Sequence, residues 1–201
     1  MGDRYDWRFK TATTANISSV QMQVPSGTSG LNRYFDFTGR TSNYISTPDS
    51  AANSITSDID VRLKVAPTTW TPSARQTVLS KGDGATDSSY YFSINSDGKL
   101  IFTRFHACAS GTDYTSSTTT GFSAGSAHWI RATSVANNGS AQSETNFYTS
   151  ADGNTWSQLG TAVTNSTGTM WDSTYNLELG GVAHGGSANY ICKIYYAEVR
   201  N

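Results

Sequence analysis

Apolar and polar residues alternate with a period of two along most of this chain. The clearest case is the segment 57–65, whose apolar residues lie two positions apart: Ile59, Val61, Leu63 and Val65. The residues between them are charged, with both signs present. This pattern predicts a strand with one buried face and one wet face. Charges of both signs on the wet face suit pairing with neighbouring strands.

Other segments show the same strand signals. A hairpin is predicted over 90–105, with Asp97-Gly98 at its turn. Strands are expected at 129–135 and 146–149, and a turn at 150–154 leads into a return strand at 155–159. The segments 17–24 and 176–179 also alternate, and 191–199 is apolar or aromatic on both sides, as in a central strand. Short strands separated by Gly, Asn, Asp and Ser predict a sandwich or barrel.

The composition favours the same fold class. The chain has 28 Ser and 28 Thr among 201 residues, and aromatic residues make up 12% of it. Strong helix formers are scarce, which excludes a helical bundle or a coiled coil. The aromatic content argues against disorder, because aromatic side chains bury enough surface to offset chain entropy.

The charge balance limits the partners. The formal net charge is -1, and the few Arg and Lys residues are scattered. A basic stripe is absent, so neither nucleic acid nor an anionic membrane surface is an expected partner. The N-terminus lacks the apolar core of a secretory signal, which fits assembly in a reducing cytoplasm. Cys108 and Cys192 would be reduced there at first, and whether they pair stays open.

Several residue runs resemble a known family when taken in order. The runs are 34–39 (YFDFTG) with 43–50 (NYISTPDS), 58–65 (DIDVRLKV), 78–83 (VLSKGD), 150–156 (SADGNTW) and 193–200 (KIYYAEVR). Together they resemble laminin-G-like, concanavalin-A-like jelly-roll domains. The last run especially is similar to modules of tailed-phage virion proteins, notably minor tail proteins of phages that infect actinobacteria.

The resemblance implies an all-β fold, a two-sheet antiparallel jelly-roll sandwich, over residues 31–201. Residues 1–30 have no counterpart in the family, so they are expected to form an N-terminal arm that attaches to other virion proteins. The family commonly binds glycans or protein surfaces, sometimes with calcium. The resemblance therefore implies a non-enzymatic protein at the virion surface that binds host-surface glycans as an adhesin. The alternative is a capsid decoration protein or structural tail protein whose main ligands are other virion proteins.

A glycoside hydrolase is a distant alternative. Retaining hydrolysis needs two carboxyl groups about 5 Å apart on either side of the scissile bond. The three glutamates, Glu144, Glu178 and Glu198, are far apart in the sequence. Asp58 and Asp60 share a strand face, but charged residues of opposite sign follow them, which indicates a solvated face. We therefore expect no catalytic residues.

The candidate glycan ligands lie in expected loops. Trp70, Tyr114 and Trp171 are candidate stacking platforms, and His184 lies in the Gly-rich segment 180–186, where a ligand can approach the backbone. The competing interpretation is that the aromatic residues pack over a sheet edge and that the Gly-rich segment is simply a loop. Trp129 and Trp156 fall in strands, so they are expected in the core.

Two further sets of candidate residues concern calcium and attachment. Asp83 and Asp87 place two carboxylates in one Gly-containing loop, so they are candidate calcium ligands, although no cofactor is required. Tyr5, Trp7 and Phe9 alternate with charged residues in the arm, and such aromatic residues anchor well in a partner groove. Homo-oligomerisation is compatible with this pattern and stays open.

Overall fold

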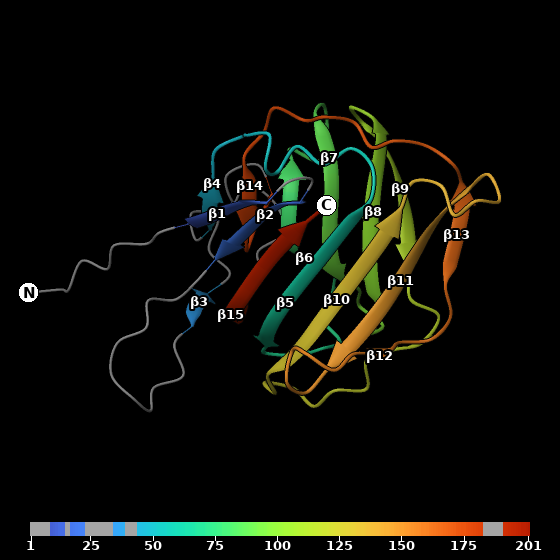
Figure 1. The fold of residues 1–201 in the computed structure, drawn as a ribbon. Coiled ribbons are helices and arrows are strands. Elements are labelled where there is room, and N and C mark those ends of the chain that lie inside the picture. Colours follow the sequence, from blue (N-terminus) through green and yellow to red (C-terminus); the bar gives the residue numbers. More distant parts are fainter. Residues whose placement is uncertain (1–8, 15–16, 23–33, 39–43, 183–190) are drawn as a thin grey trace, which may run out of the picture.

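The molecule is a two-layer sandwich of antiparallel sheets (Figure 1). The computed structural model describes residues 9–14, 17–22, 34–38, 44–182 and 191–201. Every regular element within them is a strand, so this part of the chain holds no helical segment suited to crossing a bilayer. The all-β jelly-roll fold expected from the alternation and from the family resemblance is confirmed.

The larger layer is a nine-stranded sheet. Its main path, in spatial order, is β1 (Phe9–Thr14), β2 (Ile17–Met22), β15 (Ile191–Arg200), β5 (Ile59–Pro67), β10 (His128–Val135), β11 (Gln142–Ser150) and β12 (Ser157–Gln158). Two further strands pair beside this path: β3 (Phe35–Thr38) with β15, and β13 (Val163–Ser166) with β11. The expected return strand at 155–159 is therefore reduced to the two residues of β12.

The smaller layer is a six-stranded sheet. Its spatial order is β4 (Ile45–Thr47), β14 (Leu177–Leu179), β6 (Gln76–Gly82), β7 (Ser88–Ile94), β8 (Leu100–Ala107) and β9 (Ser110–Thr115). The strands β7 and β8 are the predicted hairpin. The pairing of β6 with β7 shifts between Thr77 and Leu79, so Val78 and Leu79 both enter the core. This β-bulge leaves Thr77 and Ser80 on the opposite side of the strand.

The hydrophobic core fills the space between the two sheets. The alternating residues of β5 that were predicted to be buried, Ile59, Val61, Leu63 and Val65, are at most 3% exposed. Phe92 and Phe102 from the smaller sheet meet Phe147 from the larger sheet, and all three are fully buried. Truncation of such a residue to Ala costs about 3–5 kcal/mol.

Two buried cations tie loops to the core. The ammonium group of Lys81 is fully buried and bonds to Asp49 Oδ1 at 2.6 Å and to the Tyr175 carbonyl at 2.9 Å. The guanidinium of Arg104 donates to Ser134 Oγ at 2.8 Å and to the Gly168 carbonyl at 2.9 Å. These bonds offset part of the cost of burying two charged groups, although Arg104 Nε is buried without a hydrogen-bond partner in the described part of the chain.

Part of the expected N-terminal arm extends the larger sheet. The strand predicted over 17–24 corresponds to β2, which pairs with residues 197–200 of β15, and β1 pairs with β2 in turn. Phe9 is the first residue of β1, whereas Tyr5 and Trp7 lie outside the described residues. Cys108 is exposed and Cys192 is buried, and no disulfide joins them.

Candidate functional site

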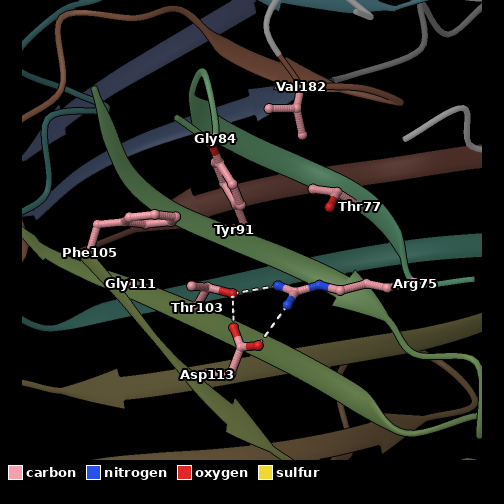
Figure 2. Close-up of a pocket in the computed structure, with 9 residues that line it drawn as sticks. All are labelled: Arg75, Thr77, Gly84, Tyr91, Thr103, Phe105, Gly111, Asp113 and Val182. Atoms are coloured by element: carbon pink, nitrogen blue, oxygen red, sulfur yellow. Dashed lines mark hydrogen bonds and ion pairs between the residues drawn. The ribbon is translucent and has the colours of Figure 1, made fainter. Parts of the chain in front are cut away.

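A pocket of about 450 Å³ lies on the outer face of the six-stranded sheet (Figure 2). We call it the sheet pocket. Its lining residues are Arg75, Thr77, Gly84, Tyr91, Thr103, Phe105, Gly111, Asp113 and Val182. The volume falls within the range of about 300–1,000 Å³ that is typical of small-molecule sites.

The strand register places the pocket residues on one face. Thr103 of β8 lies directly opposite Tyr91 of β7 on one side and Asp113 of β9 on the other. The residues that follow or precede them along these strands, such as Phe102 and Tyr114, point into the core and are fully buried. Because side chains alternate along a strand, the row of Asp113, Thr103 and Tyr91 faces outward.

One end of the sheet pocket is a closed polar triad. Arg75 donates from Nη1 to Asp113 Oδ2 at 2.7 Å and from Nη2 to Thr103 Oγ1 at 2.5 Å. The hydroxyl of Thr103 donates in turn to Asp113 Oδ1 at 2.6 Å (Figure 2). Thr103 is buried, but the side chains of Arg75 and Asp113 are 31% and 45% exposed. The triad therefore presents a donor and an acceptor side by side to solvent.

The other end of the pocket is apolar. The rings of Tyr91 and Phe105 meet edge to face with centroids 5.0 Å apart, and Val182 completes this small cluster. Val182 follows β14 and is held near the sheet by a 2.7 Å bond from Ser80 Oγ to the Gly181 carbonyl. Burial raises the pKa of Tyr91 to about 12, so its hydroxyl is protonated at neutral pH.

Glycine at position 111 leaves room for the aromatic ring. A Cβ built on Gly111 would lie 2.9 Å from the Phe105 ring and 3.0 Å from the Thr103 methyl group. Gly111 pairs with Phe105 across the β8–β9 ladder, so the missing side chain is what lets Phe105 lie over β9. The size of the pocket thus depends on this residue.

Two of the three predicted stacking aromatics are core residues instead. Trp70 is 2% exposed, packs edge to face on Phe122 and donates from Nε1 to the Ser126 carbonyl at 3.2 Å. Tyr114 is fully buried in β9, and its hydroxyl lies 2.5 Å from Ser143 Oγ. Neither ring face is open to a ligand, which corrects the expectation that these residues lie in exposed loops. His184 is outside the described residues.

Trp171 is the exposed member of the three. Its side chain is 44% exposed, and its Nε1 donates to Asp87 Oδ1 at 2.9 Å. Its backbone amide donates to the Phe105 carbonyl at 2.6 Å. The ring is therefore held at a fixed place on the surface by a residue that was expected to bind calcium.

The carboxylates of Asp83 and Asp87 are occupied by donors from the protein. Asp83 Oδ1 accepts from the amides of Ala85, Thr86 and Asp87. Asp87 Oδ2 accepts from the amide and hydroxyl of Thr174. Burial acts to raise the pKa of both carboxyl groups, but these hydrogen bonds outweigh it and lower both pKa values. Within the described residues, no three His, Cys, Asp or Glu side chains gather as a metal site.

The outer face of the nine-stranded sheet carries an array of rings and cations, which we call the cation–aromatic face. Its members are Arg62, Lys64, Trp129, Arg131, Tyr148, Trp156, Tyr195 and Tyr196. Arg131 lies 5.1 Å from the Tyr148 ring centroid and 5.6 Å from that of Trp156. Trp129 and Trp156 are half-buried here, which corrects their expected place in the core.

Asp60 lies at the centre of the charges on the cation–aromatic face. Its carboxylate accepts from Arg62 at 2.6 Å and from Arg131 at 2.8 and 2.9 Å. Burial acts to raise the pKa of Asp60, but the bonds to Arg62 and Arg131 outweigh it and lower the pKa. The sequence interpretation of Asp60 as part of a solvated charged face, rather than half of a catalytic pair, agrees with this geometry.

A smaller hollow of about 360 Å³ lies at one end of β10 and β11, which we call the edge hollow. It is lined mainly by hydroxyl groups and by the rings of Phe122 and His128. These two rings stack in parallel at 3.6 Å, and Trp70 packs against both. Burial lowers the pKa of His128, which favours its neutral form.

Comparison with known proteins gives structural likeness alone. No family model matches the chain, and no curated protein matches it in sequence. The structure is similar to the CBM40 of the Ruminococcus gnavus IT-sialidase bound to α2,3-sialyllactose. The TM-score is 0.55 and the identity 12%, and the match covers 77% of this chain and 88% of that one.

Two toxin structures show a comparable likeness. The binding domain of Paraclostridial Mosquitocidal Protein 1 has a TM-score of 0.56 at 10% identity over 95% of this chain and 44% of that one. The binding domain of botulinum neurotoxin serotype G has a TM-score of 0.50 at 9% identity over 95% and 42%. The chain spans less than half the length of these two toxin domains. At such identities the likeness shows a shared sandwich fold.

Proposed function

We propose that this chain is a non-catalytic carbohydrate-binding module whose ligand occupies the sheet pocket. The observation that carries the proposal is the triad of Arg75, Thr103 and Asp113 next to the apolar pair of Tyr91 and Phe105. A sugar has the same two parts, since its hydroxyl groups donate and accept hydrogen bonds and its C–H faces are apolar. Convergent polar groups beside an apolar wall are typical of ligand sites.

The chemistry of the triad matches adjacent sugar hydroxyls. Arg75 is a donor without acceptor capacity, and the carboxylate of Asp113 is an acceptor without donor capacity. Arg75 Nη1 and Asp113 Oδ2 are 2.7 Å apart, so the two side chains can form hydrogen bonds with hydroxyl groups on neighbouring carbons of one sugar ring. Charge-assisted hydrogen bonds of this kind are about twice as strong as neutral ones.

Binding rather than hydrolysis is proposed because of the carboxylate count at the pocket. Glycoside hydrolysis by acid and nucleophile or base needs a pair of carboxyl groups across the bond. Asp113 is the single carboxylate among the nine lining residues. The likeness to a structure that holds α2,3-sialyllactose supports a glycan as the ligand, although a fold by itself does not assign a function.

We further propose that the module is displayed on a phage particle, where it would bind host-surface glycans. The support is the resemblance of the run 193–200 and its companions to modules of virion proteins. In this setting Tyr5 and Trp7 would anchor the chain to other virion proteins. Replacing both by Ala should abolish attachment to the particle without changing the far-ultraviolet circular dichroism of the sandwich. Unchanged attachment would contradict this role.

A glycan array with the purified 201-residue chain tests the binding proposal. We expect saturable binding that Arg75→Ala weakens about 10- to 100-fold, the loss of a charged hydrogen bond of about 1.5–3 kcal/mol. Arg62→Ala is the matched control, because it removes an arginine from the opposite face of the sandwich while Arg131 still pairs with Asp60. Equal binding by wild type and Arg75→Ala would overturn the placement of the ligand in the sheet pocket.

A second candidate function is docking to another virion protein through the cation–aromatic face. Protein interfaces are enriched in Trp, Tyr and Arg, and this face gathers all three. This would make the chain a decoration or structural tail protein. Trp156→Ser should then weaken co-sedimentation with particles, whereas Arg75→Ala should leave it unchanged. Co-sedimentation that survives Trp156→Ser would exclude this candidate.

A further inference from the structure

The guanidinium of Arg75 is already committed to a carboxylate of its own chain. An unpaired arginine in a sugar site is a receptor for an acidic sugar, because its planar fork matches a carboxylate. In the sheet pocket, one Nη atom of Arg75 bonds to Asp113 and the other to Thr103. Thr103 also donates to Asp113, so the three side chains hold one another in place. An incoming carboxylate would have to share the guanidinium with Asp113, whose negative charge would lie close to its own.

The charges around the pocket add to this barrier. Besides the pair of Arg75 and Asp113, the carboxylate of Asp83 acts on the pocket. Burial raises the pKa of Tyr91, the Ser88 hydrogen bond and Arg75 oppose the shift, and Asp83 adds to it. Asp113 lines the pocket itself, whereas Asp83 lies outside the lining residues. A ligand anion would therefore meet the carboxylate of Asp113 at close range, and like charges at close range repel.

An uncharged sugar neither competes with Asp113 for the charge of Arg75 nor is repelled by the carboxylate of Asp113. Its hydroxyl groups can donate to the exposed carboxylate of Asp113 and accept from the remaining N–H groups of Arg75, while the internal ion pair stays intact. Resting on the proposed function, we infer that the sheet pocket selects uncharged glycans with neighbouring hydroxyl groups and that Asp113 is the residue that excludes anionic ones. Asp113 thus determines specificity, because Arg75 without this partner would favour acidic sugars.

The variant Asp113→Asn isolates the charge from the shape of the site. Asparagine keeps the size of the side chain and an oxygen that can accept from Arg75, but it carries no negative charge. The variant removes the one carboxylate among the lining residues, so Arg75 no longer has a charged partner there and can pair with a ligand carboxylate. The variant should therefore gain affinity for acidic glycans.

The test uses an array of neutral glycans, each printed beside its sialylated form and beside the carboxyl-reduced sialylated form. The reduced form keeps the size of the added sugar and removes its charge. Wild type should bind the neutral and reduced forms roughly tenfold more tightly than the sialylated form. Asp113→Asn should shift this ratio toward the sialylated form by roughly tenfold. Asp172→Asn is the matched control, because Asp172 is exposed and does not line the pocket.

The outcomes separate the two proposals. Wild-type binding that is equal or stronger for the sialylated form would overturn the selectivity while leaving carbohydrate binding in place. An unchanged ratio in Asp113→Asn would overturn the role of Asp113. Binding to no glycan by wild type and by Asp113→Asn alike would overturn the proposed function, and the selectivity would fall with it. Thermal unfolding of each variant confirms that the comparison is made between folded proteins.

Discussion

The two outer faces of the sandwich hold their arginine–aspartate pairs in different surroundings. On each face an arginine side chain and aromatic rings lie over strands whose other side faces the core. On the cation–aromatic face, Arg62 and Arg131 both bond to Asp60 and lie over aromatic rings. At the sheet pocket, the pair of Arg75 and Asp113 is partly exposed beside a hollow.

This difference shows that an arginine–aspartate ion pair does not by itself form a ligand-binding site. An ion pair becomes available to a ligand when space lies next to it and when its remaining donors and acceptors reach solvent. Gly111 supplies that space on the smaller sheet, because a side chain there would meet Phe105. On the larger sheet a β-bulge in β15 between Ile194 and Tyr196 brings two tyrosine rings to the surface, where they pack against Lys64 and Trp129.

The largest expected effect is the loss of stability in Asp60→Ala. The side chain of Asp60 is only 18% exposed and accepts hydrogen bonds from Arg62 and Arg131. Its removal therefore leaves two half-buried cations side by side. We expect a fall of about 2 kcal/mol in the free energy of unfolding, between the values for exposed and buried pairs. Urea denaturation measures it. Asp97→Ala is the control, since its pair with Lys99 is exposed and 3.8 Å long. Equal losses in both variants would contradict the comparison.

The next effect is the loss of ligand binding in Gly111→Ala. The added Cβ lies 2.9 Å from the ring of Phe105, so this ring, which lines the sheet pocket, must shift and change the shape of the pocket. We expect roughly tenfold weaker glycan binding, or about 1.4 kcal/mol, by calorimetric titration. The neighbouring exposed variant Ser110→Ala should bind as wild type does. Full binding by Gly111→Ala would show that the space beside Phe105 is not used.

A smaller effect is expected for Thr103→Val, which keeps the shape and removes the hydroxyl group. Arg75 and Asp113 then lose the buried group that orients both of them. We expect binding to weaken by about 1 kcal/mol. Thr115→Val, on the same face of β9, is the control and should leave binding unchanged. If both variants bind equally well, the hydroxyl of Thr103 has no positioning role.

The smallest effect concerns pH and the edge hollow. The pKa of His128 in the folded chain lies below its ordinary value of 6.5 because burial disfavours the charged form. The unfolded chain therefore takes up a proton first, and stability falls as the pH drops from about 6.5 toward the lower folded value. Thermal unfolding at pH 7 and pH 5.5 should show a smaller difference in His128→Gln than in wild type. An identical pH dependence would contradict the burial argument.

The fold was predictable because strand alternation is a local signal. The segment 57–65 and the hairpin over 90–105 show it within a few residues, and both appear as expected in β5, β7 and β8. The sheet pocket was not predictable in this way. Thr103 and Asp113 lie on different strands and are brought together by the register of β8 with β9. Arg75 precedes β6 and reaches both of them through its side chain.

The aromatic residues show the same limit. Trp70 was expected to be exposed because it lies between prolines, but Ser126 and Phe122, more than 50 positions away, cover it. The outward orientation of Trp129 was predictable from the sequence, since Ile130 and Ala132 are its alternating neighbours and point into the core from β10. At this position the period of two predicts the side of the strand better than apolar character does.

Nuclear magnetic resonance titration with the best array glycan tests the central claim most directly. The account predicts that amide signals of Tyr91, Thr103 and Asp113 shift on binding, while the indole signals of Trp129 and Trp156 on the opposite face stay unchanged. Shifts confined to the two indoles and to the amides around Asp60 would contradict it, because they would place the ligand on the cation–aromatic face instead of the sheet pocket.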